Sequence, residues 1–158
     1  MINLQKSLDK KILKEKELKL ETTIDKRFLA LLVELSEFSN ELRCFKYWSN
    51  KSTYKSFEKM LDEYIDCIHF IISIGLCFNI DLENYVFKHQ EEQDLTLLIL
   101  KTMNYVLNFW NEKTKNYFIM ILDNFFTISF LLNIDFSIIY NAYLKKNDIN
   151  FERIQNNY

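Results

Sequence analysis

The chain of 158 residues contains one glycine and no proline. β-Sandwiches and β-barrels need many turn residues, so this scarcity disfavours an all-β fold. It also excludes a glycine-rich phosphate-binding loop, and with it the P-loop and the dinucleotide-binding fingerprint. If a protein of this composition binds phosphate groups, it must hold them with side chains and metal ions.

An excess of charge of one sign is also missing. Twenty basic residues face 22 acidic residues, and the net charge is −2. This balance provides no broad field for holding nucleic acid, so we expect no nucleic-acid partner. Any polyanion would have to be held by local basic residues or by metal.

Cysteines and uninterrupted hydrophobic runs are scarce. The three cysteines form no CxxC pair and are typical of reduced thiols. The N-terminus is charged and lacks the apolar segment of a signal peptide. The most hydrophobic run, residues 117–134, is interrupted by Asp123 and Asn124, which is typical of a core helix and not of a membrane span. We therefore expect a cytoplasmic protein that does not insert into membranes.

Hydrophobic residues make up 49% of the chain and recur at three- and four-residue steps. This periodicity predicts amphipathic helices, and the length suits one domain with a real core. The expected helices cover approximately residues 2–13, 28–42, 55–76, 94–110, 113–132 and 135–147, followed by a polar tail over 148–158. The sequence therefore predicts an all-α bundle formed by residues 1–158 as a single domain.

The tripeptide Asn-Ile-Asp occurs twice, at residues 79–81 and 133–135. We interpret the first copy as the start of an additional helix, with Asp81 as its N-cap. A shared capping solution explains the repetition more simply than two related halves of the chain. Gly75, near the end of the preceding helix, is expected to permit a close packing contact.

Two pairs of acidic residues stand within helical patterns, Glu34 with Glu37 and Glu63 with Asp66. Residues three apart lie on one helical face, so each pair directs two carboxylates the same way. Four carboxylates on neighbouring helices would suit one or two Mg²⁺ ions, which prefer hard oxygen ligands. The alternative is that both pairs are ordinary solvated surfaces. Phe70, on the same side as the second pair in an otherwise buried helix, favours a site.

Two further segments admit both a structural and a functional interpretation. Residues 45–49, Phe-Lys-Tyr-Trp-Ser, form either a hydrophobic plug or a loop that stacks on a base and faces phosphate. Residues 145–153 mix cations and amides, and taken alone they are typical of a solvated tail. His69, on an apolar helix, is by itself typical of a satisfied core residue.

Four motifs in order carry a family resemblance: Leu4-Gln5-x-x-Leu8-Asp9, then Ala30 to Ser49, then Glu63-x-x-Asp66-x-x-His69-Phe70, and Lys146-Asn147-x-x-Asn150-x-x-Arg153. With these motifs the chain resembles, nearly end to end, the dimeric all-α dUTP diphosphatases. These belong to the all-α NTP pyrophosphatase superfamily, which includes the MazG-like enzymes. The acidic motifs alone would indicate only the superfamily.

The resemblance implies a helical bundle with a central four-helix metal-binding core. It assigns the Mg²⁺ ligands, for two or more ions that Mn²⁺ can replace, to Glu34, Glu37, Glu63 and Asp66. Glu37 and Glu34 would also be catalytic, with Asn40 or Glu41 supporting the ligands. The implied substrate contacts are Gln5 and Asp9 at the uracil, Trp48 over the base, Phe70 on the deoxyribose, and Lys46, Lys146, Asn147, Asn150 and Arg153 at the phosphates.

The implied reaction converts dUTP, and dUDP, to dUMP, with pyrophosphate released from dUTP. The implied assembly is a homodimer in which the neighbouring subunit completes the active site. The chain departs from the family pattern at Ile154 and Asn157, before Tyr158, and at Asp9, where some relatives carry Asn. The alternatives are a related pyrophosphatase that prefers dCTP or a modified nucleotide, and a non-enzymatic helical interaction module.

Overall fold

The computed structural model describes residues 1–50 and 54–156, and the regular elements in these ranges are all helical. The helices are α1 (Ile2–Glu15), α2 (Ile24–Leu42), α3 (Phe57–Cys77), α4 (Leu95–Glu112), α5 (Lys115–Leu131) and α6 (Phe136–Gln155), with a 3₁₀ helix, η1 (Leu20–Thr23), before α2. The predicted all-α fold is confirmed.

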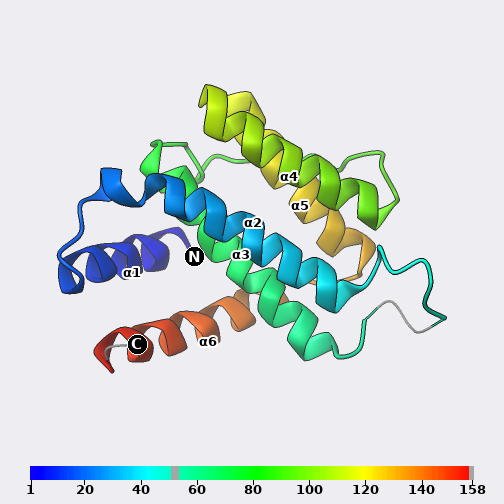
Figure 1. Ribbon diagram of the computed structural model, residues 1–158, viewed down its shortest axis with the longest axis horizontal. Helices are drawn as coiled ribbons and strands as arrows, with labels where there is room; N and C mark the ends of the chain where they lie inside the picture. Colours follow the sequence, from blue (N-terminus) through cyan, green and yellow to red (C-terminus); the bar gives the residue numbers. More distant parts are fainter. Residues whose placement is uncertain (51–53, 157–158) are drawn as a thin grey trace.

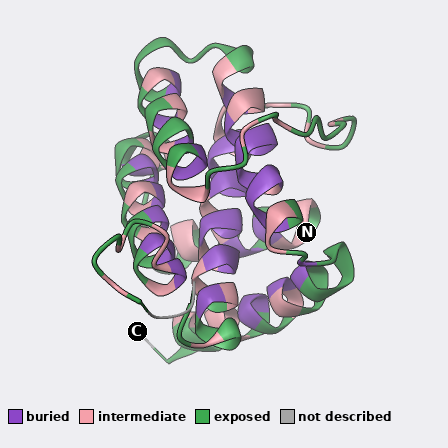
Figure 2. Ribbon diagram, turned by 90° about the vertical axis from the view of Figure 1, so that its right-hand side faces the viewer, coloured by how far each residue is buried: buried purple, intermediate pink, exposed green. Residues whose placement is uncertain are grey.

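Helices α2 and α3 form an antiparallel pair through the middle of the molecule (Figure 1). The α4–α5 hairpin packs on one side of this pair, and α1 and α6 pack on the other. The apolar stripes predicted for α2 to α5 supply most of the core, and their buried sides turn toward one another (Figure 2). The site described below lies where α1 and α6 meet the central pair.

Local sequence signals explain where two of these helices begin. The Ser56 hydroxyl accepts a hydrogen bond from the Lys59 amide at 3.3 Å and caps the start of α3. The Asp94 carboxylate caps α4 by accepting bonds from the amides of Thr96 and Leu97 at 2.7 and 3.2 Å. Both side chains satisfy amides that have no partner within their helix.

Gly75 permits the close contact expected of it. A Cβ atom at this position would lie 2.8 Å from Cζ of the Phe118 ring and 3.1 Å from Cδ1 of Leu82. Phe118 is buried and packs on Phe109, so its ring has little room to move. The absence of a side chain at residue 75 therefore allows α5 to approach α3.

The predicted helix start at Asp81 is wrong, because residues 78–94 contain no helix. The repeated tripeptide instead ends helices. Asn79 and Asn133 adopt φ values of 52° and 54°, and the amide of the isoleucine after each donates to the carbonyl five residues earlier at 2.9 Å. This is the Schellman C-cap, in which asparagine tolerates the left-handed conformation. Both copies of the Asn-Ile-Asp tripeptide therefore share a capping function, but they cap the C-termini of α3 and α5.

The predicted polar tail is also wrong for residues 148–155, because α6 continues to Gln155. The inward side of α6 carries Tyr143, Asn147, Asn150 and Ile154, which recur at helical spacing but include two amide side chains. A search for hydrophobic periodicity alone does not detect such a face. Asn157 and Tyr158 lie outside the described residues.

No described helix is by itself both long and apolar enough to cross a membrane. Within the part of the chain that the structure describes, one pair of helices, α5 and α6, reaches the required length and composition together, across a bend of 111°.

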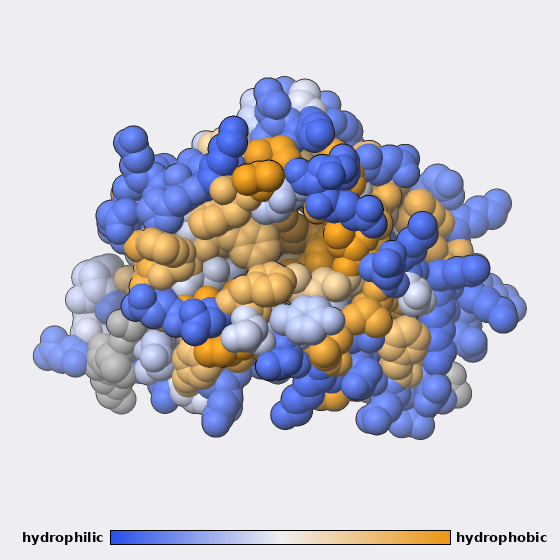
Figure 3. Space-filling view, turned by 180° about the vertical axis from the view of Figure 1, so that it is seen from behind, coloured by the Kyte–Doolittle hydropathy of each residue, from blue (hydrophilic) through white to orange (hydrophobic). Residues whose placement is uncertain are grey.

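The face opposite to that of Figure 1 is hollowed, and hydrophobic residues gather around the hollow (Figure 3). A pocket of about 590 Å³ is lined mainly by apolar residues of α3, α5, the start of α6 and the loop before α4. Phe130 and Phe136 at this pocket are 61% and 62% exposed. The predicted site residues lie elsewhere.

Candidate active site

The α2–α3 pair brings three of the four predicted metal ligands together. Oxygen atoms of Glu34 and Glu37 on α2 and of Glu63 on α3 all lie within 4.8 Å of one another. Each acidic pair lies along the flank of its helix that faces the other helix, because residues three apart share a face. Antiparallel packing of α2 on α3 then places the two flanks side by side.

The fourth predicted ligand, Asp66, is held by a buried lysine from α6. Lys146 Nζ lies 2.6 Å from Oδ2 of Asp66 and 2.9 Å from Oδ2 of Asp62. Lys146 is only 7% exposed, so its ammonium group needs these carboxylates to compensate for the loss of water. This ion pair fastens α6 to α3 beside the acidic cluster.

The electrostatics of the cluster show strong crowding of negative charge. Burial, and then the charges of Asp66, Glu37 and Glu63, raise the pKa of Glu34 to about 7. Burial also raises the pKa of Glu63 and, despite Lys146, that of Asp66. A cation would relieve this repulsion, and the donors are all carboxylate oxygens. The residues therefore fit a hard divalent cation such as Mg²⁺.

A pocket of about 520 Å³ lies between α1, α2, α3 and α6, with Glu34 and Asp66 in its wall. This volume is within the usual range for small-molecule sites. Five of the predicted substrate contacts line the pocket, namely Gln5, Asp9, Phe70, Asn150 and Arg153. Ile154, one of the departures from the family pattern, lines it as well. The structure thus gathers residues from both ends of the chain around one cavity.

On its other side the acidic cluster borders an open groove. Glu37 and Glu63 line this groove together with Asn40, Glu41 and the apolar residues Leu29, Leu32 and Val33. The cluster consequently lies between this pocket and a more open groove. This arrangement can hold a ligand that has a compact, partly apolar end and a charged, solvated end.

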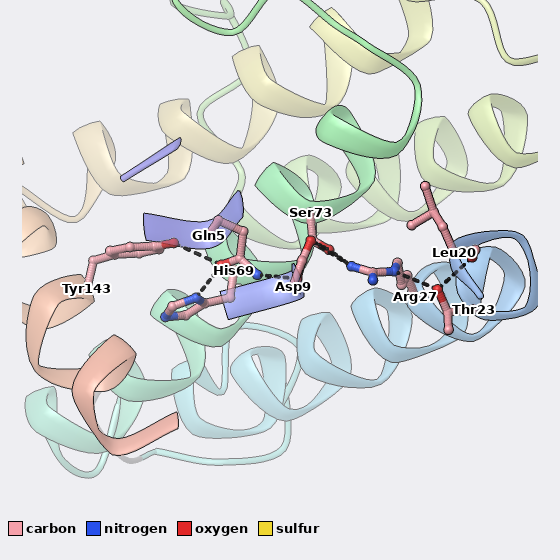
Figure 4. Close-up of polar contacts among 8 residues, drawn as sticks. All are labelled: Gln5, Asp9, Leu20, Thr23, Arg27, His69, Ser73 and Tyr143. Atoms are coloured by element: carbon pink, nitrogen blue, oxygen red, sulfur yellow. Dashed lines mark hydrogen bonds and ion pairs between the residues drawn. The ribbon is translucent and has the colours of Figure 1, made fainter. Parts of the chain in front are cut away.

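A buried polar network forms the wall of the pocket nearest to α1 (Figure 4). The oxygen of the Gln5 amide accepts a bond from the Tyr143 hydroxyl at 2.9 Å and lies 2.7 Å from His69 Nδ1. Its nitrogen donates to Asp9 at 2.8 Å, and Asp9 pairs with Arg27 at 2.8 Å. These residues come from four helices, α1, α2, α3 and α6, so the network joins them at one point.

His69 participates in this network in its neutral form. Burial, and then the charge of Lys146, lower the pKa of His69 to about 4. Because the Gln5 oxygen can only accept, the His69 Nδ1 atom carries the hydrogen. The ring also stacks on Tyr143, with centroids 4.1 Å apart. The interpretation of His69 as a core residue is confirmed for its burial, and the structure adds its contact with Gln5.

The other predicted contacts lie outside the pocket wall. Trp48 is 65% exposed and packs edge to face on Tyr47, while Lys46 Nζ donates to Oδ1 of Asn40 at 2.7 Å. Asn147 is buried near Lys146, and the structure gives its side-chain oxygen no hydrogen-bond partner among the described residues. The aromatic loop thus folds on itself near the groove.

Sequence reasoning missed Arg27, Ser73, Tyr143 and Asp62. Arg27 and Ser73 are polar residues at positions where the apolar stripes of α2 and α3 require buried side chains, and both are buried. A polar residue inside such a stripe was the available signal. Asp62 precedes Glu63 and is more exposed, so nothing in its spacing marked it as a partner of Lys146.

The fold and the site place the chain in a class of all-α proteins with a carboxylate cluster between two helices and a ligand pocket beside it. A family model described as dUTPase matches residues 1–158, the whole chain. The chain therefore belongs to the dUTPase family, and the resemblance found in its four motifs is confirmed. It is a dUTP diphosphatase, whose substrate is a nucleotide and whose activity is the hydrolysis of dUTP. No curated protein matches the chain.

The raised pKa of Glu34 predicts a pH-dependent stability in the metal-free protein. The pKa of Glu34 rises from 4.5 to about 7 on folding, so its protonated form stabilises the folded protein. This contribution to the free energy of unfolding is fully present below about pH 4.5 and is lost as the pH rises through about 7. Glu34→Gln cannot ionise. We expect its melting temperature, relative to that of the wild type, to increase between about pH 5 and pH 8 in the presence of EDTA.

The matched control is Glu83→Gln, which removes one carboxylate from the exposed loop before α4, outside the acidic cluster. His69 has the opposite effect on stability, because its pKa is lowered and the folded protein therefore loses stability as the pH falls. The wild type and both variants contain His69, so its effect cancels when they are compared. A difference between Glu34→Gln and the wild type that stays constant with pH would contradict the assignment.

Proposed function

We propose that this enzyme hydrolyses dUTP to dUMP and pyrophosphate in a reaction that requires Mg²⁺, that it also accepts dUDP, and that it thereby keeps uracil out of DNA. The observation that carries the proposal is the position of the acidic cluster between the pocket and the more open groove. A nucleoside in the pocket would direct its phosphates past the carboxylates into the groove.

The metal site would be formed by Glu34, Glu37, Glu63 and Asp66. Their crowded carboxylates support two or more Mg²⁺ ions, with Mn²⁺ able to substitute. When bound, such ions supply charge neutralisation for the phosphates and lower the pKa of a coordinated water. Lys146, which already neutralises Asp66, would remain close enough to share its charge with the phosphates.

In the proposed reaction the carboxylates act on the attacking water, and the basic side chains stabilise the charge on the phosphates. Glu37, with Glu34 beside it, orients or deprotonates the water that attacks the β-phosphorus in line with the bridging oxygen. The bond from the β-phosphorus to this oxygen breaks, and dUMP leaves with the oxygen. This reaction needs only an α–β anhydride, which is the reason to expect dUDP as a substrate. The buried Lys146 stabilises charge on the transferred group.

The remaining predicted contacts would complete recognition. Gln5 in the pocket wall would face the uracil, and the exposed Trp48 would close over it from the aromatic loop. Phe70 would pack on the deoxyribose. The groups available to the phosphates, beyond Lys146, are Lys46, Asn147, Asn150 and Arg153.

The decisive experiment measures pyrophosphate release from dUTP, dTTP, dCTP and UTP with Mg²⁺, with Mn²⁺ and with EDTA. We expect metal-dependent release from dUTP alone, and a loss of about 10² or more in kcat for Glu37→Gln, which removes a general base. Glu83→Gln serves as the matched control and should keep wild-type activity.

Three outcomes would revise the proposal in different ways. Turnover by Glu37→Gln near the wild-type rate would remove the role given to this residue. A preference for dCTP or another nucleotide would keep the metal site and replace the assigned base. Release in EDTA as fast as in Mg²⁺ would exclude the metal requirement.

Sugar selection provides a second test. Phe70 lines the pocket beside Asp66 and Glu34, where its ring would crowd a ribose 2′-hydroxyl. We expect Phe70→Ala to reduce the ratio of kcat/KM for dUTP to that for UTP by about tenfold, since one steric contact is removed. Phe57→Ala at the exposed start of α3 is the control. An unchanged ratio in Phe70→Ala would contradict this role.

We further propose that the enzyme is a homodimer whose interface includes the outer face of α2 and α4. Leu29 and Val33 on α2 and Leu97, Leu100 and Leu107 on α4 are all exposed, and the two helices pack on each other. An apolar surface of this kind is typical of an interface. It continues into the groove beside Glu37 and Glu63, so a second copy there would supply residues next to the cluster.

Sedimentation velocity at micromolar concentration should show a dimer for the wild type and a monomer for Leu100→Glu, because a charge cannot be buried unpaired at the interface. Phe130→Glu, at a similarly exposed position on α5, should remain dimeric. A monomeric wild type would exclude the dimer. Dissociation of Phe130→Glu alone would move the interface to the apolar pocket that Phe130 lines.

A further inference from the structure

Arg27 is a buried cation that none of the roles above uses. It lies on α2 and is 8% exposed. Its Nε atom donates to the Thr23 hydroxyl at 3.1 Å, and its Nη1 atom donates to Asp9 Oδ2 at 2.8 Å and contacts the Ser73 hydroxyl. A guanidinium group is retained in such a place only with a charge partner. Asp9 is that partner, so the two residues form one unit.

The carboxylate of Asp9 is occupied on both of its oxygens. Oδ2 accepts from Arg27 and from Ser73 at 2.7 Å, and Oδ1 accepts from the Gln5 nitrogen at 2.8 Å. An ionised carboxylate offers no hydrogen, so it can only face the nitrogen of the Gln5 amide. Rotating that amide by half a turn would place its oxygen against a carboxylate oxygen. The ion pair with Arg27 holds the Asp9 carboxylate in place, and thereby fixes the orientation of Gln5.

The fixed orientation decides what Gln5 can offer to a ligand. Its oxygen already accepts from Tyr143 and from His69. Its nitrogen carries two hydrogens, and Asp9 takes one of them. The group left for the pocket is therefore a donor, which matches a carbonyl oxygen of a pyrimidine. Uracil has a carbonyl at the position where cytosine has an amino group, so a fixed donor discriminates between them.

We propose that Arg27, acting through Asp9, is a positioning residue that sets the donor character of Gln5 and with it the preference of the pocket for uracil over cytosine. The inference rests on the proposed function in that the base is taken to lie at Gln5. An asparagine at position 9 could present either its nitrogen or its oxygen to Gln5 and would need no cation. In this chain the Asp9 carboxylate, paired with Arg27, presents only an acceptor, so the Gln5 amide has a single orientation. Ser73 contributes a second hydrogen bond to the same carboxylate.

The test is a double-mutant cycle of Arg27→Met and Gln5→Met. The readout is the ratio of the dissociation constants of the α,β-imido analogues of dCTP and dUTP, measured by calorimetry with Mg²⁺. We expect Arg27→Met to reduce this ratio by about tenfold in the wild-type background and to have no further effect in the Gln5→Met background, because two residues that act as a unit are not additive. A purely structural role for Arg27 would lower both affinities equally and leave the ratio unchanged.

An unchanged ratio in Arg27→Met, or an equal reduction in both backgrounds, would overturn the inference, as would a wild type that binds both analogues equally or neither. Ser73→Ala is a milder variant in case Arg27→Met does not fold, and it should reduce the ratio in the same direction. Lys10→Met on the exposed side of α1 is the matched control and should keep the wild-type ratio. Because these analogues are not hydrolysed, the result is independent of the pyrophosphate assay that tests the proposed reaction.

Discussion

The packing of α2 against α3 is the interaction on which the site depends. The acids of each helix are three residues apart, but only contact between the helices brings the oxygens of Glu34, Glu37 and Glu63 within 4.8 Å. Like charges at this distance repel, and the apolar residues buried along the same two helices supply the free energy that holds them together. The hydrophobic core is therefore what maintains a site that is electrostatically strained.

The protein treats its partly buried acids in two ways. Asp9 and Asp66 are each paired with a buried cation, Arg27 and Lys146, and each pair fastens a peripheral helix to the central ones. For Glu34, by contrast, burial and then the charges of neighbouring carboxylates raise the pKa to about 7. A paired acid such as Asp9 serves as a joint between helices, whereas crowded acids leave affinity for a cation. Asp66 belongs to both groups, because it pairs with Lys146 and also adds to the negative charge around Glu34. The neighbours of an acidic residue thus decide whether it joins helices or contributes to the proposed metal site.

Helices α1 and α6 bring the motifs at the two ends of the chain together in one pocket wall. Gln5 from α1 and Tyr143 from α6 are 138 residues apart in sequence and share a hydrogen bond of 2.9 Å. Both helices pack on α3, which contributes His69 and Ser73 to the same network. A dUTPase pocket closed in this way requires the whole chain to fold, since no single segment contains its wall.

Periodicity and motif spacing were sufficient to predict the helices and the acidic pairs, because both depend on local geometry. Residues three apart share a helical face in any context, so the pairing of Glu34 with Glu37 needed no tertiary information. Long-range polar contacts have no such local rule. The structure shows three such features: the pair of Arg27 with Asp9, the pair of Lys146 with Asp62, and the continuation of α6 past residue 147. Each of them depends on contacts between segments that are distant in the sequence. Packing of distant segments decided those pairings, and with them the shape and polarity of the pocket.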